Sequence, residues 1–120
     1  MRLITHNLLA CNVKSCTNGY PLRIDSEAII VKEKNKIDRE FVEKMLTRLD
    51  YYVLHSAAKS IGIDIPPTYD RDVQLSDEFI DTVGNTILNV SVKEGKLVCP
   101  SCAHVFTIKN GIPNMVLKDE

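Results

Sequence analysis

Glycine-rich loops and long apolar runs are both missing from this sequence. Only five glycines are spread over its 120 residues, which leaves no loop of the kind that cradles a phosphate. The patterns G-x-S-x-G, H-E-x-x-H and G-x-G-x-x-G are also absent, and these are common signatures of hydrolases, zinc proteases and dinucleotide-binding enzymes. The sequence therefore shows none of these catalytic or phosphate-binding motifs.

Runs of apolar residues are short throughout the chain. None approaches the roughly 18 residues that a transmembrane helix requires, so we expect no membrane span. The first residues, Met1 to Asn7, lack the apolar core and the cleavage site of a signal peptide. Without a secretion signal, thiols are expected to stay reduced, which favours metal binding over disulfide formation.

The four cysteines stand as two close pairs at opposite ends of the chain. Cys11 and Cys16 form the first pair, and Cys99 and Cys102 form the second. The C-x-x-C spacing holds two thiolates at the separation that tetrahedral Zn²⁺ requires, and the other pair completes a four-sulfur site. The spacing predicts one structural Zn²⁺ that clamps the two ends of the chain together. Such a site is closed to water, so its metal would not be catalytic.

Other interpretations of the cysteines stay open. The four thiols could be buried without a metal, or Cys99 and Cys102 could form a redox pair of the thioredoxin type. A redox pair sits at a helix N-terminus, whereas a strand pattern follows here at 105–108. His104 is a further candidate ligand, although four cysteines already fill a tetrahedral site. Ala103 occupies a position where zinc-binding turns often have glycine.

The middle of the chain repeats apolar residues with the period of an α-helix. Three amphipathic helices are predicted, with Asp38, Asp50 and Ser76 as their N-caps. Pro66-Pro67 interrupts helix formation between the second and the third. We interpret residues 33–87 as a helical insertion.

Both ends of the chain alternate apolar and polar residues as strands do. We expect a strand in residues 1–10, strands between Tyr20 and Val31, and a strand from Leu88 that turns back at Glu94-Gly95. The sequence therefore predicts an α+β fold. Its zinc-ribbon-like β domain is formed by both chain ends, residues 1–32 and 88–120, and carries the three-helix insertion.

The segment from Gly111 to Leu117 is apolar and extended. Pro113 within it is poorly suited to a central strand. The segment either packs on the ribbon's own core or offers an edge for strand pairing with a partner protein.

Four segments resemble the multifunctional methyltransferase subunit family. They are M-R-L-I-T-H-N-L-L at 1–9, G-Y-P-L at 19–22, L-V-C-P at 97–100 and G-I-P-N-M at 111–115. The resemblance extends over essentially the whole chain, although the helical middle matches in pattern rather than in residues.

The resemblance implies a non-catalytic subunit that keeps methyltransferases soluble and active. Partners of this family are Rossmann-like, S-adenosylmethionine-dependent enzymes that modify tRNA, rRNA and a translation termination factor, and each forms a heterodimer that excludes the others. The methyl donor would bind the partner, RNA would be reached at most through the partner, and the protein would act in the cytoplasm and nucleus.

The resemblance also implies where a partner binds. Family members contact their partners largely through the zinc-ribbon part, by strand pairing and burial of apolar surface. Carried onto this sequence, that points to the final segment and two apolar residues near it: Leu8, Phe106, Ile112, Pro113, Asn114, Met115 and Val116.

A nucleic-acid-binding zinc ribbon is the alternative function. It would require a basic face around the cysteines, formed by residues such as Arg2, Lys14, Arg23 and Lys109. The formal net charge is only −1, from 15 basic against 16 acidic side chains, and this balance counts against non-specific binding of nucleic acid.

Overall fold

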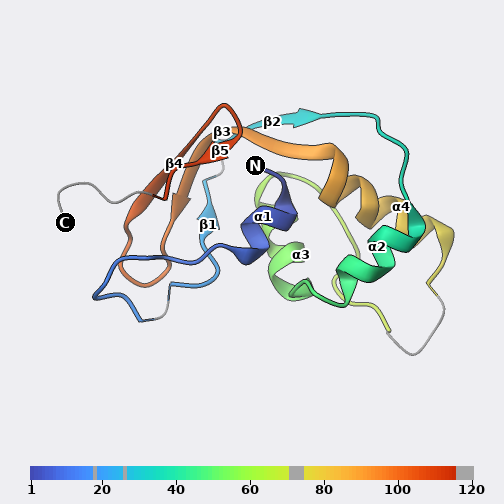
Figure 1. Cartoon of the computed structure of the whole chain (residues 1–120), viewed down its shortest axis with the longest axis horizontal. Helices are drawn as coiled ribbons and strands as arrows, with labels where there is room; N and C mark the ends of the chain where they lie inside the picture. Colours follow the sequence, from blue (N-terminus) through green and yellow to red (C-terminus); the bar gives the residue numbers. More distant parts are fainter. Residues whose placement is uncertain (18, 26, 71–74, 116–120) are drawn as a thin grey trace.

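The computed structural model describes residues 1–17, 19–25, 27–70 and 75–115. Within them, a β part formed by both chain ends lies beside a helical part formed by the middle, in a molecule of 48 × 28 × 20 Å (Figure 1). The predicted α+β class is confirmed. Val116, one of the predicted partner residues, lies outside the described residues.

The long strand β3, Val90–Val98, is the centre of the sheet. It pairs antiparallel with β1 (Arg23–Ile24) and β2 (Ile29–Lys32), and with β4 (Val105–Lys109), which in turn pairs with β5 (Ile112–Pro113). The sheet therefore joins segments from the first third and the last quarter of the chain.

The predicted hairpin turn at Glu94-Gly95 is wrong, because β3 runs straight through it. Glu94 pairs with Ile29 of β2, and Gly95 pairs with Ile108 of β4, so both residues belong to ladders. A Cβ on Gly95 would lie 3.0 Å from the Cβ of Ala28. The glycine allows β3 to approach the residue that precedes β2, and it does not form a turn.

The predicted strand in residues 1–10 is also wrong, since Leu3–Leu8 form the short helix α1. Leu3, His6 and Asn7 are buried on one side of it, at the spacing of neighbouring helical turns. The Asn7 amide donates to the Asp50 carbonyl at 2.9 Å and accepts the Asp50 N–H at 3.0 Å. Contacts with the distant helix α3 thus stabilise a helix that is too short to be stable alone.

The three predicted helices and their caps are confirmed as α2 (Arg39–Leu46), α3 (Tyr51–Ser60) and α4 (Asp77–Gly84). The side chains of Asp38, Asp50 and Ser76 each accept N–H groups of the first turn, as N-caps do. A π-helical turn, η1 (Asn85–Asn89), extends α4. For this reason β3 begins at Val90 and not at Leu88 as predicted.

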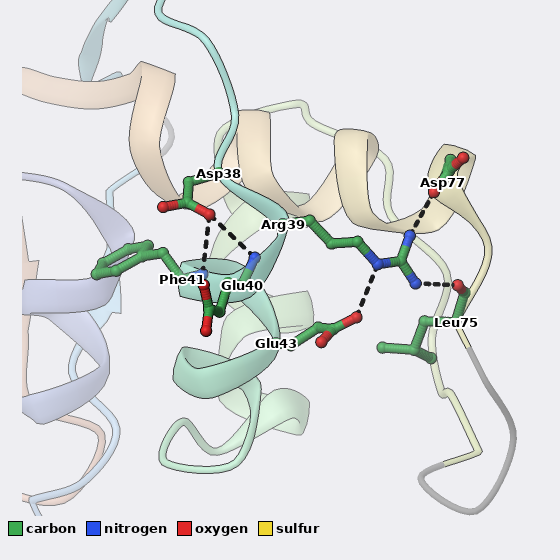
Figure 2. Close-up of polar contacts among 7 residues, drawn as sticks. All are labelled: Asp38, Arg39, Glu40, Phe41, Glu43, Leu75 and Asp77. Atoms are coloured by element: carbon green, nitrogen blue, oxygen red, sulfur yellow. Dashed lines mark hydrogen bonds and ion pairs between the residues drawn. The ribbon is translucent and has the colours of Figure 1, made fainter.

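Arg39 ties α2 to the segment that precedes α4 (Figure 2). Its guanidinium donates to the carboxylates of Glu43 and Asp77 and to the main-chain oxygen of Leu75. This side chain thus links the start of α4 to α2.

One cluster of buried apolar residues continues from the helices into the sheet. It includes Leu54 and Val83 of the helical part and Leu97, Phe106 and Ile108 of the β part. Phe106 is only 1% exposed, so this predicted partner residue supports the sheet from the core. The division into two domains stays a prediction.

Candidate metal centre and partner edge

The four cysteines converge at one end of the sheet. Cys11 and Cys16 come from the loop between α1 and β1, while Cys99 and Cys102 lie between β3 and β4. All four sulfur atoms lie within 4.8 Å of one another, with Sγ–Sγ distances of 3.7 Å for Cys11–Cys102 and 3.5 Å for Cys16–Cys99. Four thiolates about 2.3 Å from a tetrahedral Zn²⁺ would stand about 3.8 Å apart. The cysteines are free, and their arrangement fits a metal ion.

The second pair lies in a tight turn stabilised by its own backbone. The N–H groups of Ser101 and Cys102 each donate to the Cys99 sulfur at 3.3 Å. Cys99 also pairs through its main chain with Ala103 and His104. Ala103 has φ of +62°, the left-handed conformation that a glycine adopts at lower cost. The turn therefore forms with the expected geometry despite its alanine.

The first pair depends on a glycine that sequence reasoning missed. The Cys11 N–H donates to the Gly19 carbonyl at 2.8 Å, which closes the loop that carries both cysteines. A Cβ on Gly19 would lie 2.2 Å from the Cβ of Cys11, a distance at which atoms overlap. Gly19 is thus required for the position of Cys11. The only indication of this role in the sequence was that the glycine follows shortly after the cysteine pair.

The predicted partner residues fall into exposed and buried sets. Leu8 on α1 is 72% exposed and Ile112 on β5 is 68% exposed. Pro113 and Met115 are half-buried, and the exposed Asn114 continues the pairing by donating its N–H to the Thr107 carbonyl at 2.8 Å. Since β5 ends the strand order, its outer edge has no partner strand among the described residues.

Comparison with known proteins supplies the family. The family model described as Trm112p-like protein matches residues 2–111 of this sequence. The chain belongs to the Trm112p-like family.

Relatives of the Trm112p-like chain match it over nearly their whole length. It is 37% identical to the multifunctional methyltransferase subunit TRM112 homolog A of Arabidopsis thaliana, over 100% of this chain and 98% of the relative. Identity is 33% to the corresponding protein of Mus musculus (100% and 97% covered) and 30% to that of Saccharomyces cerevisiae (98% and 96% covered).

A solved structure has the same fold as the Trm112p-like chain. It is that of the E. cuniculi Mtq2-Trm112 complex, described as responsible for methylation of the eRF1 translation termination factor. The likeness has a TM-score of 0.54 with 16% sequence identity, and it covers 97% of this chain and 95% of that one.

The thiols of this Trm112p-like chain hold their protons unequally. Burial raises the pKa of Cys99, but the N–H groups of Cys102 and Ser101, together with neighbouring thiols, outweigh burial and lower this pKa to about 6. The pKa of the Cys11 thiol is raised to about 12, chiefly by desolvation. A cation that binds all four thiolates must therefore displace protons, so its affinity decreases as the pH falls.

The described histidines do not belong to the group of candidate metal ligands. Among the described residues, the group able to hold a metal consists of the four cysteines. The His104 ring instead packs on Phe106, with ring centroids 4.6 Å apart. His6 is buried, with its Nε2 atom 2.6 Å from the Leu22 carbonyl oxygen.

The structure gives little support to the two other interpretations, a thioredoxin-type redox pair and a nucleic-acid-binding zinc ribbon. A turn and strand β4 follow Cys102, and not the helix that a thioredoxin-type pair requires. Arg23 pairs with Val98 near the cysteines, whereas Lys109 lies at the far end of β4, about 14 Å along the strand. Arg2 pairs with Ser91 near the start of β3, also far from the cysteines. Of the four candidate basic residues, Lys14 and Arg23 therefore lie near the cysteines and the other two do not, so the four form no single basic face. In the described part of the chain, no helix is long and apolar enough to cross a membrane.

Proposed function

We propose that this chain is a non-catalytic subunit that binds S-adenosylmethionine-dependent methyltransferases and stabilises their active form. The observation that carries the proposal is the full-length match to multifunctional methyltransferase subunits, at 37% identity to the plant protein. The methyl donor binds the partner enzyme, and this chain contributes no catalytic group.

The E. cuniculi neighbour supports the class of partner. The matched chain, which has the fold described above, comes from a complex that methylates a translation termination factor. We infer that partners of the present chain are Rossmann-like methyltransferases that modify tRNA, rRNA or a release factor, in the cytoplasm and the nucleus. Because they would use one surface, each partner excludes the others.

One structural Zn²⁺ held by Cys11, Cys16, Cys99 and Cys102 belongs to the proposal. The sulfur–sulfur distances of 3.5 and 3.7 Å support it, as does the donor set, since four thiolates form closed structural sites. When bound, the ion neutralises part of the thiolate charge and joins the loop of the first pair to the turn after β3. The metal therefore holds the surface that binds the partner.

The partner surface is centred on β5. Its outer edge offers main-chain groups to a strand of the methyltransferase, and the exposed Ile112 side chain covers apolar surface of the partner. An uncovered sheet edge and apolar patch make a protein prone to aggregate. Binding of a subunit to the folded enzyme alone also raises the stability of that enzyme by linkage. Leu8 and Met115 extend the surface, and Phe106 supports it from below.

Affinity purification from native extract tests this function, with a tag placed after Glu120 and all stoichiometric partners identified. We expect methyltransferases with the wild-type chain and their loss with Ile112→Asp. Ile29→Asp on β2 is the matched control, because Ile29 is also exposed, at 56% against 68%, but lies on a different strand. Failure to recover any methyltransferase contradicts the function. Recovery of all partners with Ile112→Asp contradicts only the surface.

A further inference from the structure

We infer that the α-amino group of Met1 anchors the β4–β5 turn to β3, so that an acyl group or an added residue on this nitrogen loosens the turn and weakens partner binding. The nitrogen donates to the Val92 carbonyl at 2.7 Å and to the Gly111 carbonyl at 2.6 Å. The Met1 side chain is itself buried, with 5% of the residue exposed. The part of the inference that concerns binding rests on the proposed function.

Three segments meet at this nitrogen. Met1 and Val92 exchange both main-chain hydrogen bonds, since the Val92 N–H donates to the Met1 carbonyl at 2.7 Å. On the adjoining residue of β3, the Lys93 carbonyl accepts the Gly111 N–H at 2.8 Å. The α-amino group closes this arrangement by holding the carbonyl of the same Gly111. Both main-chain groups of Gly111 are thereby held, the N–H by β3 directly and the carbonyl by Met1, which is itself paired with β3.

The number of N–H donors makes the anchor sensitive to modification. An α-ammonium group has three N–H donors, enough for both carbonyls, and its charge strengthens each bond. Acetyl transfer from a thioester breaks the thioester C–S bond and forms an N–C bond. Of the two protons that the ammonium loses, one goes to the released thiol and one to solvent, which leaves one uncharged N–H; a peptide bond to a preceding residue also leaves one uncharged N–H. If the one remaining N–H donates to the Val92 carbonyl, the Gly111 carbonyl loses its donor. This carbonyl is partly buried, and loss of the hydrogen bond of such a group destabilises the turn.

The space around the nitrogen is as restricted as its hydrogen bonding. A Cβ on Gly111 would lie 3.3 Å from the Met1 nitrogen, so glycine allows the two to approach. Asn110 and Gly111 both have positive φ, +53° and +77°, which is the two-residue hairpin turn that Asn-Gly favours. Ile112, the centre of the proposed partner surface, follows at once. The anchor therefore sets the position of β5.

The test compares three full-length chains: one that begins with a free Met1 amine, one acetylated on that nitrogen, and one with Gly-Ser before Met1. Amide hydrogen exchange of the unpartnered chain reports on the anchor directly. We expect the Gly111 amide to exchange about tenfold faster in both modified chains, the effect of losing the hydrogen bond between the Met1 nitrogen and the Gly111 carbonyl. A chain extended by Gly-Ser after Glu120 is the control and should exchange as the unmodified chain does.

A pair of glycine variants separates the anchor from general strain. Gly111→Ala and Gly62→Ala both place alanine at a φ near +80°, at +77° and +80°, but an added Cβ at Gly62 meets nothing within 4 Å. In Gly111→Ala, the amide of residue 111 should already exchange faster because the added Cβ pushes against the Met1 nitrogen, so acetylation should add little. In Gly62→Ala, acetylation should speed exchange of the Gly111 amide as much as in the wild-type chain. If acetylation speeds exchange equally in both variants, the proposed coupling between the Met1 amine and Gly111 is wrong.

Binding is measured with a methyltransferase that modifies a translation termination factor. Acetylation should raise its Kd about tenfold, in step with the exchange. Unchanged Gly111 exchange after acetylation overturns the anchor. Faster exchange with an unchanged Kd supports the anchor and overturns its link to the proposed partner surface. Absence of binding even to the unmodified chain counts against the proposed function and leaves the exchange result to decide the anchor.

Discussion

The helical part and the β part of this chain are specified by contacts of very different range. Each of α2, α3 and α4 begins at a side chain that caps N–H groups two or three residues later. In the β part, Cys16 meets Cys99 across 83 positions of sequence, and Met1 meets Gly111 across 110. Helices of this kind are encoded locally, whereas the sheet becomes stable only when distant segments and the proposed metal come together.

Replacement of Cys99 by serine should have the largest effect, because it should destabilise the β part much more than the helical part. Its sulfur is nearly buried and accepts two N–H groups, and a serine hydroxyl is a poor replacement for a zinc-bound thiolate. We expect bound zinc to fall from about one ion per chain to almost none, and amides of β3 and β4 to lose protection while those of α3 keep more of theirs. Metal analysis and hydrogen exchange measure both effects.

Ser101→Ala is the control for the zinc experiment, because Ser101 lies in the same turn but contributes only its main-chain N–H. It should retain zinc and stability. Normal zinc content and normal exchange in Cys99→Ser would refute the view that the β part depends on the metal.

Asn7→Ala should have the next largest effect, because Asn7 connects the two regions. Its buried amide makes both a donor and an acceptor bond with the main chain of Asp50, and both groups of Asp50 lose a partner in the variant. The cost is about 2–3 kcal/mol of unfolding free energy, measurable by denaturant titration. Thr5→Ala, on the exposed side of the same helix, should cost little. Equal stability of the two variants would show that the regions are coupled by other contacts.

The same contrast in range explains which elements could be predicted from the sequence. The three caps and the cysteine set were found because a few residues at fixed spacing carry the signal. Helix α1 was missed because its six residues are shorter than the window of about 11 that reveals a helical period. Two of its buried residues, His6 and Asn7, are also polar, so they resemble surface positions until their partners on Leu22 and Asp50 are known.

Features that depend on a short distance between residues far apart in the chain left an even weaker signal in the sequence. Glu94-Gly95 has the composition of a turn, and only its pairing with Ile29 and Ile108 makes it part of a strand. The roles of Gly19 beside Cys11 and of the Met1 amine beside Gly111 follow from distances between atoms. No periodicity records such distances, so these two supports emerged only from the structure, whereas the segment of the proposed partner edge was already indicated by the sequence.

Ser76→Ala tests the local half of the comparison. The hydroxyl accepts the Phe79 N–H at 3.1 Å and caps α4, and loss of such a cap costs about 1 kcal/mol. We expect this loss in thermal or denaturant unfolding, with zinc content and partner recovery unchanged. Ser60→Ala, near the end of α3, is the control, since its hydroxyl donates to the Ser56 carbonyl and caps no N–H group. Loss of zinc in Ser76→Ala would contradict the view that this cap acts only on its own helix.

Ala103→Gly should have the smallest effect and the opposite sign. At φ of +62°, alanine pays a steric cost of about 1 kcal/mol, part of which glycine loses again through its greater freedom in the unfolded chain. A net gain of about 0.5 kcal/mol is expected, together with slower release of zinc to a chelator, because the turn between Cys99 and Cys102 is then free of strain. Ala58→Gly inside α3 serves as the reverse control and should destabilise the chain, since glycine weakens a helix interior and leaves a fully buried methyl group unfilled. A loss of stability in Ala103→Gly would mean that the alanine methyl makes a contact worth more than the strain, and the turn would then be fixed by packing as well as by metal.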